Sequence, residues 1–355
     1  MNMRDRDLWM VILSGLALGT LGVMLSVWGN PANSGICVSC FIENSAGALG
    51  LHNNPRMQYL RPELIGFLLG ALASAAIGRE FRSHGGSAPL LRLIAGIFLI
   101  IGCAVFIGCP IKLLLRLTAG DLTAVAGVLG LVCGVWIGIK AAVNGVELGS
   151  QRAEKTGSGL LMPFLFLLML AFLIMRPDFI NFSSQGSGAE AAPWVAALAI
   201  GFLLGGLAQR SQFCITGSIR DLIMVGLRSY MPWGLGTFLA SALIVSAATG
   251  RLHLGLYGQP GAHLEHLWSF LGMLLVGWLS ILLGGCPFRQ LVKAGEGNTD
   301  AGLVVVGMFI GGGIAQSWGI AATAAGVSMY GKAAVLAGLA FVLVVSLLFR
   351  KRGTL

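Results

Sequence analysis

Two short segments of the sequence carry a cysteine, a proline and two cations in the same order. They read IGCPIKLLLRLTAG at residues 107–120 and GGCPFRQLVKAGEG at residues 284–297. A proline directly after a cysteine is favourable in the first turn of a helix, where its missing N–H had no partner to lose. We therefore expect Cys109 and Cys286 at the N-terminal ends of short helices that begin with Pro110 and Pro287.

The cations in these segments are spaced four residues apart, which places both on one face of each short helix. The pairs are Lys112 with Arg116 and Arg289 with Lys293. A helix N-terminus attracts anions through its free N–H groups and its dipole. A charge at membrane depth is costly and typically faces a cavity, although Arg116 and Lys293 have the alternative of reaching the lipid headgroups. The pattern favours a site for a small anion.

Two more cysteines lie in short apolar segments interrupted by polar residues, Cys37 in SGICVSCFIEN and Cys214 in SQFCITGSIRD. A thiol is polarizable and a weak hydrogen-bonding group, so it suits a soft partner such as sulfur or selenium better than a hard ion. Cys103 and Cys133 are interpreted as small buried apolar residues. The motif formed by Cys37 and Cys40 has no counterpart in the second half of the chain, so no symmetric metal or redox site is expected.

The sequence repeats itself at a separation of 177 residues, which brings Cys37 onto Cys214 and Cys109 onto Cys286. Neighbouring residues match as well: Gly108, Pro110, Gly120, Ala124, Gly130 and Gly134 fall on Gly285, Pro287, Gly297, Ala301, Gly307 and Gly311. Two halves, residues 1–177 and 178–355, therefore form a tandem repeat within one membrane domain.

The composition excludes a soluble protein, because 56% of the 355 residues are hydrophobic and only 10% are charged. A net charge of +9 does not indicate nucleic acid, since the basic residues stand singly at the ends of apolar runs. About 20 apolar residues cross a bilayer as a helix. Ten runs meet that length, at residues 8–29, 62–79, 90–108, 121–143, 159–176, 192–209, 233–250, 267–285, 299–320 and 333–350.

Four segments are too short to cross, at residues 34–44, 110–120, 211–221 and 287–297. We interpret them as re-entrant half-helices or loops, because irregular backbone at membrane depth needs cover from protein or a wet cavity. Amphipathic surface helices are the alternative. The fold class is thus an all-α multi-pass membrane protein with about ten transmembrane helices.

Each half has five spans, so the second half enters the bilayer from the opposite side and the repeats are inverted. Lys and Arg are more numerous on the side that bears both termini, which predicts that this side is cytoplasmic. Loops from opposite faces then bring four thiols together near the midplane. Glu43 and Arg220 occupy equivalent positions and are expected either to pair across the interface between the halves or to cap helix ends. The five histidines fall in connecting loops and are expected to be solvated.

The segments SGICVSCFIENSAGALGLH, GCPIKLLLRLTAGD, AQRSQFCITGSIRDLI and LLGGCPFRQLVKAGEGNTDAG resemble the YeeE/YedE family of bacterial membrane proteins. The resemblance extends over most of the chain and is strongest to a branch associated with selenium transport. It implies a bundle with an hourglass profile, in which cysteines of central loops pass thiosulfate by transient S–H hydrogen bonds. On this resemblance Cys37, Cys109, Cys214 and Cys286 line the substrate route.

Together, these observations predict a permease of the bacterial inner membrane that takes up a small sulfur- or selenium-containing anion. No ATP-binding fingerprint occurs, and we expect no enzyme activity, cofactor, bound metal or nucleic-acid partner. A cytoplasmic sulfur or selenium carrier protein is a further candidate partner. The alternatives are a membrane thiol oxidoreductase or sulfur-relay protein using the same cysteines, and a soft-metal transporter.

Overall fold

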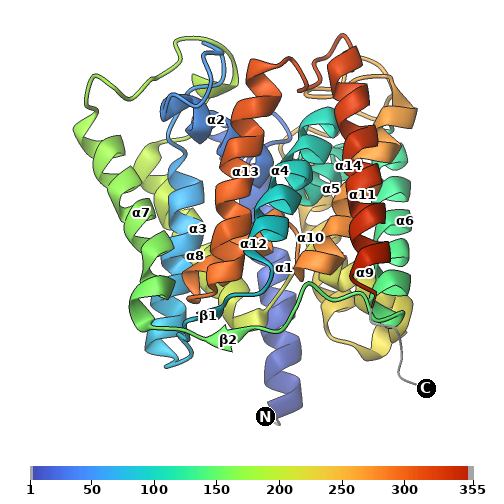
Figure 1. The fold of residues 1–355 in the computed structure, drawn as a ribbon. Coiled ribbons are helices and arrows are strands. Elements are labelled where there is room, and N and C mark those ends of the chain that lie inside the picture. Colours follow the sequence, from blue (N-terminus) through green and yellow to red (C-terminus); the bar gives the residue numbers. More distant parts are fainter. Residues whose placement is uncertain (1–2, 351–355) are drawn as a thin grey trace.

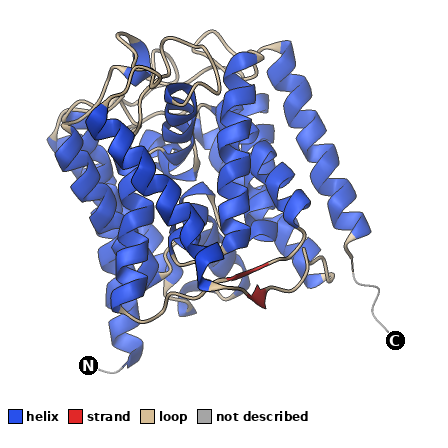
Figure 2. Ribbon diagram, turned by 60° about the vertical axis from the view of Figure 1, so that its left-hand side comes forward, coloured by secondary structure: helices blue, strands red, loops and turns tan. Residues whose placement is uncertain are grey.

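The computed structural model describes residues 3–350 and is built almost entirely of helices (Figures 1 and 2). Within that range ten helices are long: α1 (Met3–Val27), α3 (Pro62–Ile77), α4 (Pro89–Phe106), α6 (Ala124–Val143), α7 (Thr156–Met175), α8 (Trp194–Ser211), α10 (Met231–Ala248), α11 (His266–Leu283), α13 (Thr299–Ser317) and α14 (Met329–Leu348). They correspond one to one to the ten expected spans.

Nine helical stretches in the described chain are long and apolar enough to cross a membrane. Helix α3 has 16 residues, which at 1.5 Å per residue is shorter than a hydrocarbon core of about 30 Å. Outer helices expose large apolar side chains, such as Phe164 and Ile174 on α7 and Leu347 on α14. A surface this apolar is a lipid-facing surface. The prediction of an all-helical multi-pass membrane protein is confirmed.

Four short helices occupy the positions of the four segments that were too short to cross. They are α2 (Val38–Ala48), α5 (Pro110–Thr118), α9 (Ile215–Met224) and α12 (Pro287–Gly295). Nearly every residue of α2, α5 and α12 is buried, whereas α9 has an exposed face. The alternative of amphipathic surface helices is therefore wrong for α2, α5 and α12.

The break between α4 and α5 lies at Ile107, whose backbone adopts a left-handed conformation with φ of 63°. Glycines 284 and 285 form the equivalent break between α11 and α12, also with positive φ. A left-handed conformation costs a glycine little and a β-branched residue considerably more. Both breaks turn the chain inward so that a cysteine precedes each short helix.

The two halves match in their secondary structure. Helices α11 and α12 begin and end 177 residues after α4 and α5. The most extensive helix contacts pair α3 with α8, α1 with α10, α6 with α11 and α4 with α13. A shift by half the chain exchanges the first contact with the second and the third with the fourth, so this shift leaves the pattern of the main helix contacts unchanged.

Small residues let these helices approach closely. A Cβ atom added at Gly70 of α3 would collide with the Phe202 carbonyl of α8, and one at Gly205 of α8 would collide with the Phe67 carbonyl of α3. Glycine is thus required on both sides of this crossing, as in many membrane helix pairs.

Both ends of the described chain lie at one end of the bundle, together with the two short strands β1 (His84–Gly85) and β2 (Arg152–Ala153) (Figure 1). We call this end the terminal face and the other the opposite face, where α2 and the 3₁₀ turn η1 (Gly186–Gly188) lie. A second such turn, η2 (Gly226–Arg228), precedes α10.

The prediction that all five histidines are solvated is wrong for two of them. His52 and His263 are 3% and 2% exposed. The ring Nε2 of His52 lies 2.9 Å from the Glu43 carbonyl, and that of His263 lies 2.8 Å from the Val105 carbonyl. Their rings anchor loops of the opposite face to the helices beneath.

Candidate functional site

All four cysteines related by the repeat stand at the same structural position. Cys37, Cys109, Cys214 and Cys286 are the N-cap residues of α2, α5, α9 and α12. For α5 and α12 this agrees with the sequence, since Pro110 and Pro287 occupy the first helical positions. The free N–H groups of four helix N-termini therefore point toward the thiols.

The first-half cysteines form a cluster with Cys40. The sulfur atoms of Cys37 and Cys40 lie 2.6 Å apart, and the backbone N–H of Cys40 donates to Cys37 Sγ over 3.4 Å. Cys109 lies in the same buried cluster as Cys37 and interacts with it electrostatically. Cys40 has no counterpart in the second half, so the sequence does not indicate it as a site residue, yet it is the most accessible thiol of this cluster.

The second-half cysteines form a separate pair. Cys214 Sγ lies 3.5 Å from Cys286 Sγ and accepts a hydrogen bond of the same length from the Cys286 backbone N–H. The four thiols are thus arranged as two pairs, one in each half. Helix α2 contacts α12 and α5 contacts α9, so the two pairs are held by short helices that pack against each other.

Each thiol pair adjoins a cavity. The larger, about 590 Å³, lies on the opposite face and is lined by Cys40, Glu43 and Lys112 together with residues of the surrounding loops. The smaller, about 300 Å³, lies between the ends of α8, α9, α11 and α12 on the side of the terminal face. We call them the first and second cavity. Cys214 lines the second cavity, while Cys37, Cys109 and Cys286 line neither and are at most 1% exposed.

One cation of each expected pair is an ion-pair partner rather than a free charge. Arg116 is 1% exposed, and its Nε lies 2.7 Å from Asp121 Oδ2. Its guanidinium also donates to the Phe106 carbonyl and to Thr123. In the second half Arg289 pairs with Glu296 over 3.0 Å and donates to Gln212.

The other cation of each pair is a lysine that lines a cavity. Lys112 Nζ lies 3.9 Å from Cys40 Sγ in the first cavity, and Lys293 Nζ lies 3.4 Å from the Leu283 carbonyl in the second. Among the side chains of residues 6–350, neither lysine has a carboxylate within ion-pairing distance. Each half therefore neutralises its arginine and leaves one ammonium group facing a cavity.

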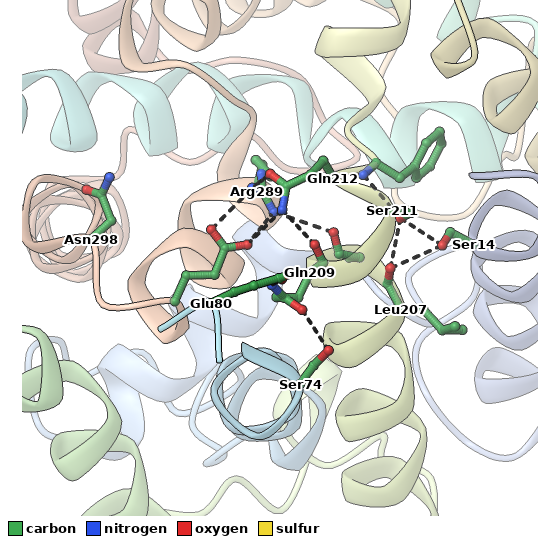
Figure 3. A network of polar contacts seen from close by, with 12 residues as sticks. Ser14, Ser74, Glu80, Leu207, Gln209, Ser211, Gln212, Arg289 and Asn298 are labelled. Carbon is green, nitrogen blue, oxygen red and sulfur yellow. Dashed lines mark hydrogen bonds and ion pairs between the residues drawn. The ribbon is translucent and has the colours of Figure 1, made fainter. Parts of the chain in front are cut away.

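The arginine of the second half belongs to a polar network at the terminal face (Figure 3). The network runs from Arg289 through Gln212 to Gln209, which bonds Ser74 over 2.7 Å and Glu80 over 2.8 Å. The network connects α12 to α8 and α3 by hydrogen bonds. The Glu80 carboxyl lies outside the membrane spans, and its hydrogen bond from Gln209 lowers its pKa. Arg289 lines the second cavity from within this network.

Glu43 and Arg220 do not pair with each other. Glu43 accepts a hydrogen bond from Gln316 of α13, whereas Arg220 pairs with its chain neighbour Asp221 over 2.6 Å. The two residues line different cavities, Glu43 the first and Arg220 the second. Equivalent positions thus give the first cavity a carboxylate and the second an additional cation.

Two polar residues of the first cavity carried no signal in the sequence. Arg61 is fully buried, and its Nε donates to Asn44 over 2.7 Å. Gln316 stands near the end of an apolar helix. No group of three or more His, Cys, Asp or Glu side chains in the described range 6–350 has the arrangement of a metal site.

Fold and site together define a multi-pass helical membrane protein with polar cavities toward both faces and thiols beside each, an architecture suited to transport. No family model matches the chain. Two curated proteins are similar to it, the probable transporter YedE of Escherichia coli (strain K12) and the probable transporter YedE of Salmonella typhimurium (strain LT2), at 30% and 31% identity over 119 residues. The aligned part is 32% of this chain and 27% of each relative, so the chain spans about a quarter of their length. The similarity supports a transporter related to the YeeE/YedE proteins.

Proposed function

We propose that the protein is a permease that takes up a small sulfur- or selenium-containing anion through a route lined by Cys37, Cys109, Cys214 and Cys286. The observation that carries the proposal is the repeated unit of an N-cap thiol, a helix N-terminus and an unpaired lysine at a cavity. Each cavity has one such lysine, Lys112 in the first and Lys293 in the second.

The parts of this unit act on an anion in different ways. The ammonium groups attract it into each cavity, and the helix N-termini stabilise its charge where water is excluded. Thiols then replace part of its hydration with weak S–H contacts. Weak contacts favour flux, because a tightly held ion would not leave.

In the same proposal residues 1–177 and 178–355 are inverted repeats, and both termini are cytoplasmic in a bacterial inner membrane. The exchange of helix contacts between the halves and the excess of Lys and Arg on the terminal face support this arrangement. The first cavity then receives the anion from outside, and the second releases it to the cytoplasm. A soluble carrier of sulfur or selenium is a candidate acceptor there.

Uptake by reconstituted protein tests the proposal directly. Proteoliposomes are supplied with labelled thiosulfate, selenosulfate or selenite, with sulfate as the hard-anion comparison. We expect uptake of at least one soft anion in preference to sulfate, and its loss in alanine variants of the four cysteines. Equal uptake by wild type and all four variants would overturn the proposal.

A thiol oxidoreductase or sulfur-relay protein is the second candidate, favoured by the 2.6 Å approach of Cys37 Sγ and Cys40 Sγ. That function predicts a disulfide or persulfide that accumulates during turnover and is visible by mass spectrometry of alkylated protein. Uptake of intact, doubly labelled thiosulfate with all thiols still reduced would exclude it.

A further inference from the structure

Glu43 is a buried carboxylate in a cavity that is otherwise suited to anions. It follows Cys40 by one helical turn on α2, is 5% exposed and lines the first cavity together with Lys112. A fixed negative charge at this position would repel the substrate. The roles proposed above for the cysteines and the lysines do not explain why a carboxyl group lies in this cavity.

The hydrogen-bond partners of Glu43 are neutral. Its Oε2 accepts from Gln316 Nε2, and Gln316 Oε1 in turn accepts from Asn54 Nδ2 over 2.8 Å. The described residues place no cation within ion-pairing distance of the Glu43 carboxylate. Burial without a counter-charge disfavours the ionised form of a carboxylic acid.

The surrounding elements do not supply that counter-charge. Helix α13, against which α2 packs, contributes Gln316 and the close approach of Gly312. The other charged residues that line the same cavity are Lys112, Arg56, Arg61 and Glu190. The thiols of Cys37, Cys40 and Cys103 and the ring of His52 also lie near Glu43, and Glu63 of α3 lies next to Arg61. Of these, Arg61 donates a hydrogen bond to Asn44, and Glu63 accepts one from Asn30. The cations of α12, Arg289 and Lys293, line the second cavity instead.

We propose that Glu43 is a proton-binding site coupled to the anion, so that a proton on its carboxyl and the anion beside Lys112 occupy the first cavity together. This inference rests on the proposed anion transport. The proton comes from the solution that fills the cavity, converts the carboxylate to a carboxylic acid and removes the repulsion. Because linkage is reciprocal, the bound anion also makes proton binding more favourable.

The coupling has a definite sign. Anion affinity is highest where Glu43 is protonated and decreases as the pH rises above that range. For one linked proton the dissociation constant increases toward a limit of about tenfold per pH unit. An anion that carries the proton inward is driven by a proton gradient, which supplies an energy source in a chain without an ATP-binding fingerprint.

Binding of thiosulfate to the purified full chain tests the coupling. It is measured between about pH 5.5 and 8, because burial moves the titration of a carboxyl above its ordinary value of about 4.3. Thiosulfate remains a dianion throughout, so its own titration does not contribute. We expect wild-type affinity to weaken as the pH rises. Glu43→Gln keeps an oxygen acceptor for Gln316 and is expected to bind with the low-pH affinity at every pH.

Two further variants control for folding and for general electrostatics. Glu43→Asp keeps a titratable group and is expected to retain a pH dependence, with a displaced midpoint. Glu190→Gln removes an exposed carboxylate from the rim of the same cavity and is expected to retain the wild-type profile. A flat wild-type profile, or the same slope in Glu43→Gln as in wild type, would overturn the proton site. Absence of thiosulfate, selenosulfate and selenite binding at every pH would instead refute the proposed function.

Proteoliposomes with an acidic exterior provide the transport measurement. Wild type is expected to accumulate thiosulfate and to alkalinise the exterior, whereas Glu43→Gln only equilibrates the anion without moving protons. A sodium gradient at constant pH serves as the alternative driving force. Accumulation with sodium and not with protons would contradict the inference.

Discussion

Cys214 and Cys286 are 72 positions apart in the chain, and their sulfur atoms lie 3.5 Å apart at the N-termini of two different short helices. Cys37 and Cys109 have the same separation in sequence and lie together in one buried cluster. In the proposed function, these two groups of thiols bind the soft anion, one group next to each cavity.

Replacement of Cys286 or Cys109 by alanine is expected to lower uptake of the soft anion about fivefold or more, since a lost hydrogen bond of about 1 kcal/mol corresponds to that factor. Serine at either position retains a hydroxyl donor and should keep part of the flux. The measurement is initial uptake of labelled thiosulfate by proteoliposomes. Cys133→Ala, a thiol outside both clusters, serves as the control. If serine variants were as inactive as alanine variants, thiol redox chemistry would be favoured over hydrogen bonding.

Lys112→Met removes an unpaired charge from the first cavity while it keeps a side chain of similar length. We expect anion affinity to fall about tenfold or more, because a charge pair at about 4 Å contributes up to about 4 kcal/mol at an effective dielectric constant near 20. The thermal unfolding midpoint in detergent should not decrease, since no ion pair is lost. Wild-type affinity in this variant would remove Lys112 from the binding site.

Arg116→Met is expected to give the opposite result although it lies one turn further along α5. It leaves Asp121 buried without its cation, which costs about 3–5 kcal/mol of unfolding free energy. Thermal unfolding in detergent measures the loss. The double variant with Asp121→Asn removes the orphaned charge and should recover part of it. An unchanged midpoint in the single variant would mean that the pair contributes little.

Gly70→Ala places a methyl group against the Phe202 carbonyl at the crossing of α3 and α8. Overpacking of this kind costs about 1–3 kcal/mol, which should appear as a lower unfolding midpoint. Gly236→Ala on α10 meets no atom within 4 Å and is the matched control, expected to be neutral or slightly stabilising. Equal behaviour of the two variants would contradict the tight crossing.

Burial lowers the pKa of His263, which lies in a loop outside the membrane spans. In the neutral ring Nε2–H donates to the Val105 carbonyl and Nδ1 accepts from the backbone N–H of Glu265. The folded protein therefore binds this proton less readily than the unfolded chain, whose histidines titrate near pH 6.5. Stability is fully present above about pH 6.5 and decreases as the pH falls below it.

Unfolding midpoints measured at about pH 7.5 and at about pH 5, on either side of the unfolded-state pKa of histidine, test this prediction. The midpoint of His263→Gln should fall less on acidification than that of wild type. His253→Gln, at an exposed loop position, should show the wild-type difference. A larger fall in His263→Gln than in wild type would contradict the neutral ring.

Much of the helical arrangement could be predicted from local signals. Pro110 and Pro287 fixed the starts of α5 and α12, and apolar runs located the long helices to within a few residues. The roles of the cations could not be predicted, because a spacing of four residues is identical for a free charge and a paired one. Only the fold shows that Asp121 pairs with Arg116 and that Glu296 pairs with Arg289. The lysine without an ion-pair partner is therefore the first cation of the pair in one half, Lys112, and the second in the other, Lys293.

The first cavity could not be predicted from the sequence either, for a different reason. Its wall includes Gln316 and residues of η1, which are far from the cysteines in the chain and carry no motif. Loop residues are brought to such a wall by long-range contacts, such as the bond from Arg61 to the Ser187 carbonyl. A residue pattern along the chain does not indicate such contacts between distant residues.

The N-cap position of all four cysteines has an evolutionary implication. Serine, threonine, asparagine and aspartate cap helix N-termini best, so a lineage selected for stability alone would drift toward a hydroxyl or a carboxylate at these sites. Cysteine at all four of these caps departs from that preference, as expected if sulfur at these positions serves a function other than capping.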